Sequence, residues 1–336
     1  MKGHLPAIAT ISLGWHSSHT LEWKLRSAAL NGFAGVEMVY SDLEKFASSR
    51  SLSMLDAAPV AKDLCDNLGL TIVSLAAFEN FEGASTPMST RLVMAKEWIA
   101  LARALGTSVI QIPSTYDPDA SGDWDTIVRD LRLLADLGAS GGPCISFAYE
   151  ALAWGVHIAL WEDSLRVVNL VDRPNFGLCL DTYHVLARLW ADPRSKSGKA
   201  PGGDAALKMS LERFMKDCPV DKIIYVQLSD AERLDPPLLP GHEVYIDSKD
   251  PTQLWCSFGR LFPFETEKGG YLPVIDVCRT WLVDKGWKGW VSMEVFHRAM
   301  HEEATSPEVL ADRGMQSWFK TSKALGLPLM AGVSKL

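Results

Sequence analysis

Eight short apolar segments alternate along this chain with longer segments of helical periodicity, and this alternation restricts its possible folds more than any other feature. The apolar segments read as buried strands over 7–13, 35–39, 71–75, 109–112, 145–149, 176–180, 223–228 and 290–295. Helical patterns cover about 19–31, 56–68, 88–105, 123–138, 162–171, 204–216, 274–285 and 306–323. Strict alternation predicts parallel strands joined by crossover helices, and the continuous apolar character fits burial on both faces.

Eight such units predict an α/β fold in which residues 1–336 form one (β/α)8 TIM barrel. A doubly wound sheet is the alternative, but no G-x-G-x-x-G follows the first strand. Two long insertions follow the sixth and seventh strands, at 191–204 and about 229–270. Both are predicted βα loops on the C-terminal face, where the active sites of barrels lie.

Composition indicates a soluble, cytoplasmic protein. The 336 residues carry a formal charge of −8, which disfavours nucleic acid or an anionic membrane as a partner. The six cysteines form no C-x-x-C pair, so we expect them to be reduced. No apolar run reaches the roughly 18 residues of a membrane span. A polar or anionic small molecule is the expected partner, and a homo-oligomer is possible.

Four oxygen-bearing side chains lie at the ends of strands five to eight. They are Glu150 in CISFAYE, Asp181 in NFGLCLD, Gln227 in KIIYVQ and Glu294 in GWVSMEV. A charge at the end of a buried strand is unfavourable unless something pairs with it. Neighbouring strands of a barrel could bring all four to one divalent cation, and oxygen ligands suit Mg²⁺, Mn²⁺ or Co²⁺ better than Zn²⁺. The alternative is that each acid forms its own ion pair with Arg or Lys.

Other polar residues on the same face are candidates for catalysis or substrate binding. Glu37 ends the second strand and could bond a substrate hydroxyl or form a structural ion pair. His184 follows Asp181 by three residues and is the main candidate for a general base, against a structural role. Arginines suit an anionic substrate, and aromatic residues after the strands could line a pocket. The remaining candidates are Arg91, Arg260, His242, His297 and Phe78.

The segments YEALAW, WEDS and NFGLCLDTYH resemble the sugar phosphate isomerase/epimerase superfamily of barrels, as do YVQLSDAERLDPPLLPGH and GWVSMEVFHRAM. More narrowly, they resemble the fungal 3-dehydroshikimate dehydratases of quinate catabolism. The resemblance covers nearly the whole chain and is densest from Phe147 to Met300. It implies that Glu150, Asp181, Gln227 and Glu294 are the ligands of one divalent cation.

The resemblance also implies a reaction. The dehydratases often place Gln where epimerases place His, so Gln227 marks the dehydratase branch. His184 matches the proposed base of bacterial relatives, and Arg91 and Arg260 match arginines that hold the substrate carboxylate. The implied reaction is loss of water from 3-dehydroshikimate through an enolate, which gives protocatechuate.

The chain departs from the fungal pattern at the predicted pocket. Leu75-Ala76-Ala77-Phe78 lacks a Gln and a Pro, and Cys256-Ser257-Phe258 replaces two polar residues of the lid. The fungal family also often has Asn where His184 stands. These changes leave open a paralogue that acts on a less polar metabolite. A metal-dependent isomerase or epimerase, with Glu150 and Glu294 moving the proton, and a non-catalytic binding barrel are the other hypotheses.

Overall fold

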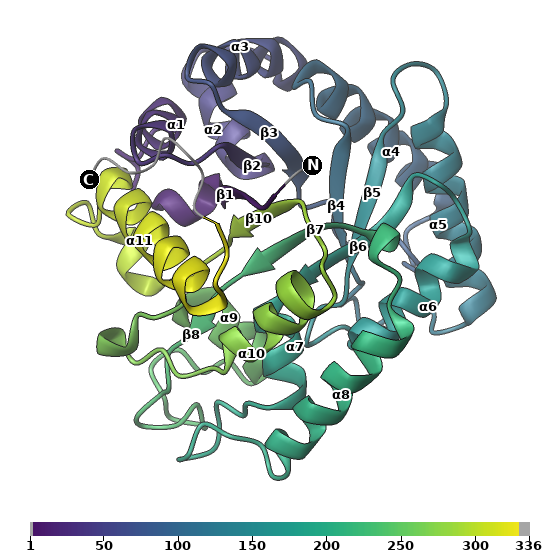
Figure 1. The fold of residues 1–336 in the computed structure, drawn as a ribbon. Helices are drawn as coiled ribbons and strands as arrows, with labels where there is room; N and C mark the ends of the chain where they lie inside the picture. Colours follow the sequence, from purple (N-terminus) through teal and green to yellow (C-terminus); the bar gives the residue numbers. More distant parts are fainter. Residues whose placement is uncertain (1–2, 329–336) are drawn as a thin grey trace.

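The chain folds into a closed barrel of eight parallel strands, which confirms the predicted fold class (Figure 1). The computed structural model describes residues 3–328. The barrel strands are β1 (Leu5–Ala9), β2 (Gly35–Val39), β3 (Thr71–Ala76), β4 (Val109–Pro113), β5 (Ser146–Glu150), β6 (Phe176–Asp181), β7 (Ile223–Leu228) and β10 (Trp290–Met293). Each pairs with its neighbours in this order, and β10 pairs with β1 to close the barrel.

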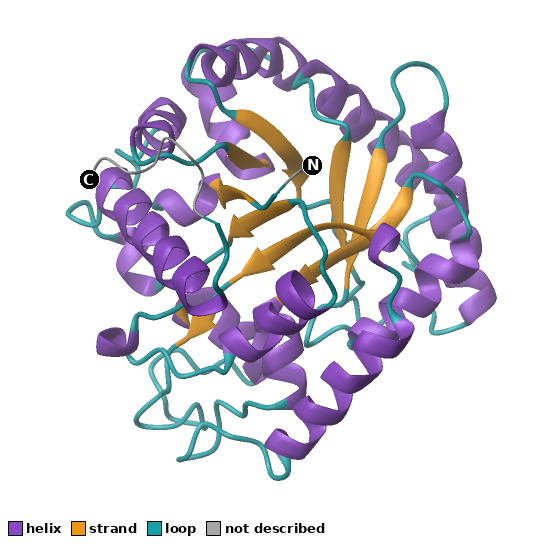
Figure 2. Cartoon of the chain, viewed as in Figure 1, coloured by secondary structure: helices purple, strands orange, loops and turns teal. Residues whose placement is uncertain are grey.

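Helices surround the barrel on its outside, except α9, which lies at its mouth (Figure 2). The helices are α1 (Leu21–Leu30), α2 (Tyr40–Ser49), α3 (Met54–Asn67), α4 (Met88–Ala104), α5 (Trp124–Ala139), α6 (Trp161–Val171), α7 (Thr182–Leu189), α8 (Gly203–Asp217), α9 (Pro251–Gly259), α10 (Val274–Cys278) and α11 (Pro307–Leu325). Side-chain caps begin several of them: the Ser53 hydroxyl accepts from the Asp56 N–H at α3, and Asp123 accepts from the Thr126 N–H at α5. Within residues 3–328, no helix combines the length and the apolar character needed to cross a membrane.

The structure differs from the sequence prediction at several element boundaries. β1 ends at Ala9 and is followed by a 3₁₀ helix (Thr10–Leu13), and β10 ends at Met293. The helices α2, α7 and α9 lie in segments that the pattern left as loops. Two of them, α2 and α7, begin directly at a strand end with no Gly or Pro between, so no turn residue separates the two periodicities.

Alternation along the strands explains why the metal-ligand candidates face the barrel interior. Ala7, Val73, Ala148, Cys179 and Tyr225 form one apolar cluster of side chains contributed by the barrel strands. Successive side chains of a strand point to opposite faces, so residues two positions further along point the same way. Ala148 is thus followed inward by Glu150, Cys179 by Asp181, and Tyr225 by Gln227.

The long segment after β7 is ordered and docked over the barrel mouth. It contains α9 and a two-stranded antiparallel sheet of β8 (Asp230–Ala231) and β9 (Arg260–Leu261). Asp230 Oδ1 accepts from the Leu272 backbone N–H at 2.8 Å, which ties the start of this segment to its end. The other insertion follows α7 rather than β6 itself, and its Pro193 carbonyl accepts from the Leu238 N–H at 2.9 Å. The two predicted insertions therefore pack against each other.

Candidate active site

A cavity of about 360 Å³ opens at the C-terminal mouth of the barrel. Its lining includes the carboxylates of Glu79, Glu150 and Glu294 together with Gln111, His184 and Arg260. Its aromatic walls are Trp15, Tyr116, Trp154 and Phe296. Among residues 3–328, Arg260 is the only Arg or Lys in this lining. The cavity is therefore aromatic and acidic, with a single guanidinium.

Two bridging donors join the four predicted metal ligands in two pairs. Gln111 Nε2 donates to Glu150 Oε2 at 2.9 Å and lies 3.4 Å from Gln227 Oε1. Arg260 donates to Asp181 Oδ2 at 2.5 Å and to Glu294 Oε2 at 3.1 Å. All four ligand candidates are buried. The two pairs meet at Glu150 and Asp181, which belong with His184 to one close group of donor atoms, whereas Glu294 lies outside that group.

This centre has the chemistry of a cation site. Glu150, Asp181 and His184 each place one donor atom within 4.8 Å of the others. Glu150 Oε1 is buried and has no hydrogen-bond partner among the described residues. Burial, together with the neighbouring Asp181 and Glu294 carboxylates, raises the pKa of Glu150 well above its usual value, and burial raises that of Glu294 to about 8. A divalent cation would relieve the repulsion among these carboxylates.

Glu37 lies beneath Gln227 and outside the cavity lining. Gln227 Nε2 donates to both carboxylate oxygens of Glu37, at 3.2 and 3.1 Å, and the Ser74 hydroxyl donates to Glu37 Oε2 at 3.1 Å. Burial raises the pKa of Glu37. Because a carboxylate accepts from the amide nitrogen, Glu37 turns the Gln227 oxygen away from itself and toward the Gln111 amide. Glu37 therefore positions a ligand candidate, and the structure does not bring it into contact with the cavity.

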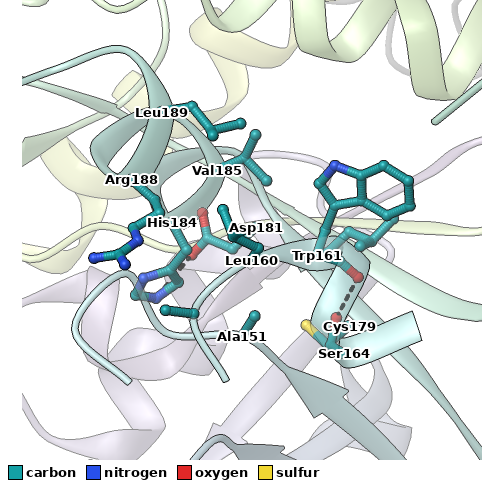
Figure 3. A pocket seen from close by; sticks show the side chains of 12 residues that line it. Ala151, Leu160, Trp161, Ser164, Cys179, Asp181, His184, Val185, Arg188 and Leu189 are labelled. Atoms are coloured by element: carbon teal, nitrogen blue, oxygen red, sulfur yellow. Dashed lines mark hydrogen bonds and ion pairs between the residues drawn. The ribbon is translucent and has the colours of Figure 1, made fainter. Parts of the chain in front are cut away.

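His184 lies on the first turn of α7, beside the Asp181 carboxylate (Figure 3). Its Nδ1 accepts from the Ala153 backbone N–H at 3.1 Å, and its Nε2 lies 3.7 Å from Glu150 Oε1 and 3.9 Å from Asp181 Oδ2. Burial, followed by the nearby Arg260 charge, lowers the pKa of His184 well below its usual value, so the ring is neutral. A neutral ring that accepts at Nδ1 carries its proton on Nε2. In this orientation His184 Nε2–H is a hydrogen-bond donor and not a metal ligand, and the role of general base predicted from the sequence stays a prediction.

The space drawn in Figure 3 lies on the far side of His184, between α6 and α7. Its free volume is about 10 Å³, and its walls include Leu160, Trp161 and Val185. A volume of this size holds about one water molecule at most. It is a packing void and not a substrate site.

Arg91 and Phe78 belong to a second pocket on the other side of the loop after β3. This pocket has a volume of about 470 Å³ and shares Ala77 and Glu79 with the barrel-mouth cavity. The Arg91 guanidinium donates to Asp130 at 2.7 Å and to the Phe81 carbonyl at 2.5 Å. The structure therefore places neither Arg91 nor Phe78 with the ligand centre, and the substrate-binding role of Arg91 stays a prediction.

Replacement of Arg91 by Met should lower the free energy of unfolding by about 3 kcal/mol, because it leaves the buried Asp130 carboxylate without its main partner. The double variant Arg91→Met/Asp130→Asn should recover part of this loss. Urea denaturation of both variants and the wild type measures the effect. A raised KM with unchanged stability would instead assign Arg91 to substrate binding.

The remaining sequence candidates lie outside the cavity lining, as do the ligand candidates Asp181 and Gln227. His242 is in the long segment after β7, near Phe258, and His297 Nε2 is 3.6 Å from Glu232. Of the positions at which the chain departs from the fungal pattern, Ala77 and Cys256 line the cavity, whereas Ala76 and Phe258 do not. The incoming Phe258 therefore does not line the pocket.

Comparisons with known proteins agree with this architecture. The sequence profile described as xylose isomerase-like TIM barrel matches residues 25–321. A 3-dehydroshikimate dehydratase of Neurospora crassa is 40% identical over 340 residues, which cover 96% of this chain and 95% of the relative. The chain belongs to the xylose isomerase-like TIM barrel family and groups within it with this fungal relative.

Solved structures of this family share the fold. A xylose isomerase-like TIM barrel/4-hydroxyphenylpyruvate dioxygenase fusion protein superposes with a TM-score of 0.75 at 27% identity. The match covers 98% of this chain and 45% of the fusion protein, so the chain spans less than half of that protein. The IOLI protein, described with a bound zinc atom, has a TM-score of 0.69 at 17% identity, with 95% of this chain and 99% of that chain covered. The second likeness supports the fold alone.

The sequence pattern did not predict two polar residues of this region, Gln111 and Glu82. Gln111 lies inside the apolar segment VIQIP. A single amide in an otherwise apolar strand is the signal that could have indicated a site residue there. Glu82 is fully buried in the loop after β3, where its Oε1 accepts from the Thr115 N–H at 2.7 Å and from the Tyr149 hydroxyl at 2.8 Å. It joins the loops after β3 and β4 to strand β5, and nothing in its local sequence indicates burial.

Glu82 should make stability depend on pH. Burial raises its pKa from 4.5 to about 7, so the carboxyl is harder to ionise in the folded chain than in the unfolded one. The contribution of Glu82 to the free energy of unfolding is therefore fully present below pH 4.5 and is lost as pH rises through about 7. The variant Glu82→Gln should lack this loss, and its stability relative to wild type should rise by about 3 kcal/mol between pH 4 and pH 8. Urea denaturation of both proteins across this range measures the difference; parallel pH curves would contradict the assignment.

Proposed function

We propose that this chain is a divalent-metal-dependent lyase that removes water from 3-dehydroshikimate and gives protocatechuate. The observation that carries the proposal is the convergence of Glu150, Asp181, Gln227 and Glu294 at one barrel mouth in a chain that is 40% identical to a 3-dehydroshikimate dehydratase. The reaction needs one group that acidifies the C–H next to a ketone and a second group that moves its proton. Residues of this cavity could supply both.

The ligand centre would hold the cation. Glu150, Asp181 and Glu294 supply carboxylate oxygens, and Gln227 supplies its amide oxygen, turned by Glu37. This oxygen set suits Mg²⁺, Mn²⁺ or Co²⁺. A bound divalent cation would act as a Lewis acid that polarises the substrate ketone and lowers the barrier to enolate formation.

We assign the transfer of the substrate α-proton to Glu150. This residue lines the cavity, its Oε1 is unpaired among the described residues, and a positioned carboxylate can act as a general base. We assign Glu150 Oε1 to remove the α-proton and return it to the departing hydroxyl, which leaves as water. His184 Nε2–H, 3.7 Å from Glu150 Oε1, would donate to that hydroxyl and orient it.

The assay uses 3-dehydroshikimate with Mg²⁺, Mn²⁺ or Co²⁺ and follows the absorbance of the aromatic product. EDTA should abolish turnover, and added metal should restore it. The alternative function, isomerisation or epimerisation by the same carboxylates, predicts deuterium uptake from D₂O into recovered substrate without an aromatic product. Absence of aromatic product with all three metals would overturn the proposed substrate.

A further inference from the structure

Arg260 holds two of the four ligand candidates in a buried ion-pair network. Its side chain is fully buried, and it donates to Asp181 Oδ2 at 2.5 Å, to Glu294 Oε2 at 3.1 Å and to the Ser229 hydroxyl at 2.9 Å. The other oxygen of Asp181, Oδ1, accepts from the Tyr183 N–H at 2.6 Å as the cap of α7. Oδ2 is thus the Asp181 oxygen left for a cation, and the guanidinium occupies it.

The backbone of Arg260 is held on two sides, so its side chain is the part that can move. β9 pairs with β8 through Arg260 and Ala231, and the Arg260 N–H donates to the Phe296 carbonyl at 2.9 Å. The guanidinium lies 4.9 Å from the Tyr183 ring centre and 5.2 Å from that of Phe296. Arg260 is also one of the residues that line the 360 Å³ cavity.

Charge balance at the centre is incomplete. Three carboxylates, Glu150, Asp181 and Glu294, face one guanidinium, and Glu150 Oε1 has no partner among the described residues. In the described part of the chain, the one Arg that lines the cavity is already paired with two carboxylates. An anionic substrate therefore finds no unpaired Arg in this lining. Metal binding and anion binding therefore both depend on the same guanidinium.

We propose that Arg260 is an exchangeable counter-cation: a divalent cation displaces its guanidinium from Asp181 and Glu294, and the freed guanidinium then binds the anionic group of the substrate. The inference rests on the proposed function for the metal and for the anionic substrate. It makes binding ordered, with the metal first and the substrate second. Arg260 competes with the metal and is not merely a support for its ligands.

The first test measures the affinity for Mn²⁺ alone, from the electron paramagnetic resonance signal of free Mn²⁺, in wild type, Arg260→Gln and Arg260→Lys. Removal of the competing charge should tighten Mn²⁺ binding at least tenfold in Arg260→Gln, whereas Arg260→Lys should stay close to wild type. Equal or weaker binding by Arg260→Gln would overturn the exchange. Circular dichroism shows whether the variants fold, and Mn²⁺ should raise the Tm of Arg260→Gln more than that of wild type.

The second test uses shikimate, a carboxylate without the ketone, as the anionic probe. Wild type should bind it at least tenfold more tightly with Mn²⁺ than with EDTA, as measured by tryptophan fluorescence, and this gain should vanish in Arg260→Gln. A gain of the same size in the variant, or none in wild type, would overturn the anion step. If wild type binds no Mn²⁺, the metal dependence of the proposed function fails and the exchange fails with it. If wild type binds Mn²⁺ and turns over but Arg260→Gln binds no tighter, the exchange alone fails.

Discussion

The variant Glu150→Gln should lose at least about 10³-fold in kcat/KM for 3-dehydroshikimate, which corresponds to about 4 kcal/mol of transition-state stabilisation. The change removes one carboxylate ligand and, in the proposed mechanism, the group that moves the proton. The amide oxygen of the introduced glutamine can still accept from Gln111, so the local packing should survive. Deuterium uptake at the α-carbon in D₂O should disappear together with turnover.

The free energy of unfolding distinguishes a loss of activity in Glu150→Gln from misfolding of the variant. In metal-free protein, the Glu150 carboxylate is destabilised by burial and by the Asp181 and Glu294 charges. The neutral Glu150→Gln should therefore be more stable than wild type in EDTA, by at least about 1 kcal/mol, while it binds Mn²⁺ more weakly. The matched control is Glu44→Gln, at an exposed position on α2, which should change neither quantity. A Glu150→Gln enzyme that keeps its turnover and its metal would show that the four-ligand site is wrong.

The variant His184→Ala should lower kcat by about 10²-fold or more and change KM little. Loss of the Nε2–H donor leaves the departing hydroxyl without its orienting partner, while Glu150 can still take the α-proton. The variant should therefore exchange the α-proton of the substrate with D₂O faster than it releases protocatechuate. Nuclear magnetic resonance of recovered substrate measures this exchange.

Two outcomes would correct the role of His184. If His184→Ala abolishes exchange and elimination together, then His184 is the base, as the sequence first predicted, and its ring must leave the Ala153 N–H in the active complex. If neither rate changes, the residue is structural. The matched control is His157→Ala, an exposed residue whose ring contacts the Ala120 carbonyl and lies outside the cavity lining; it should behave as wild type.

The strand-end quartet could be predicted because its determinants are local. Each of the four follows a short apolar run, and alternation along a strand specifies which face a residue occupies. Closure of the barrel then brings the ends of β5, β6, β7 and β10 to one mouth. The helix α7 was missed for the opposite reason: it begins directly after β6, so Asp181 is both a strand end and a helix cap.

The positions of the arginines could not be predicted in the same way. Arg91 and Arg260 were both predicted to hold the substrate carboxylate, yet Arg91 pairs with Asp130 and Arg260 lies among the candidate ligand carboxylates. An arginine side chain is long and flexible, and its place depends on which acid the fold brings within its reach. Glu82 and Gln111 were not predicted because their hydrogen-bond partners come from other strands and loops.

By itself, the sequence determined the barrel, its order of strands and the quartet of candidate oxygen ligands, since hydrophobic periodicity and strand-end position are properties of short segments. Only the tertiary structure decided the state of these groups. It turned the Gln227 amide by contact with Glu37, set the tautomer of His184 by contact with Ala153, and gave two ligands to Arg260. Orientation, protonation and charge pairing depend on atoms a few ångströms away in space, and those atoms belong to segments far apart in the chain.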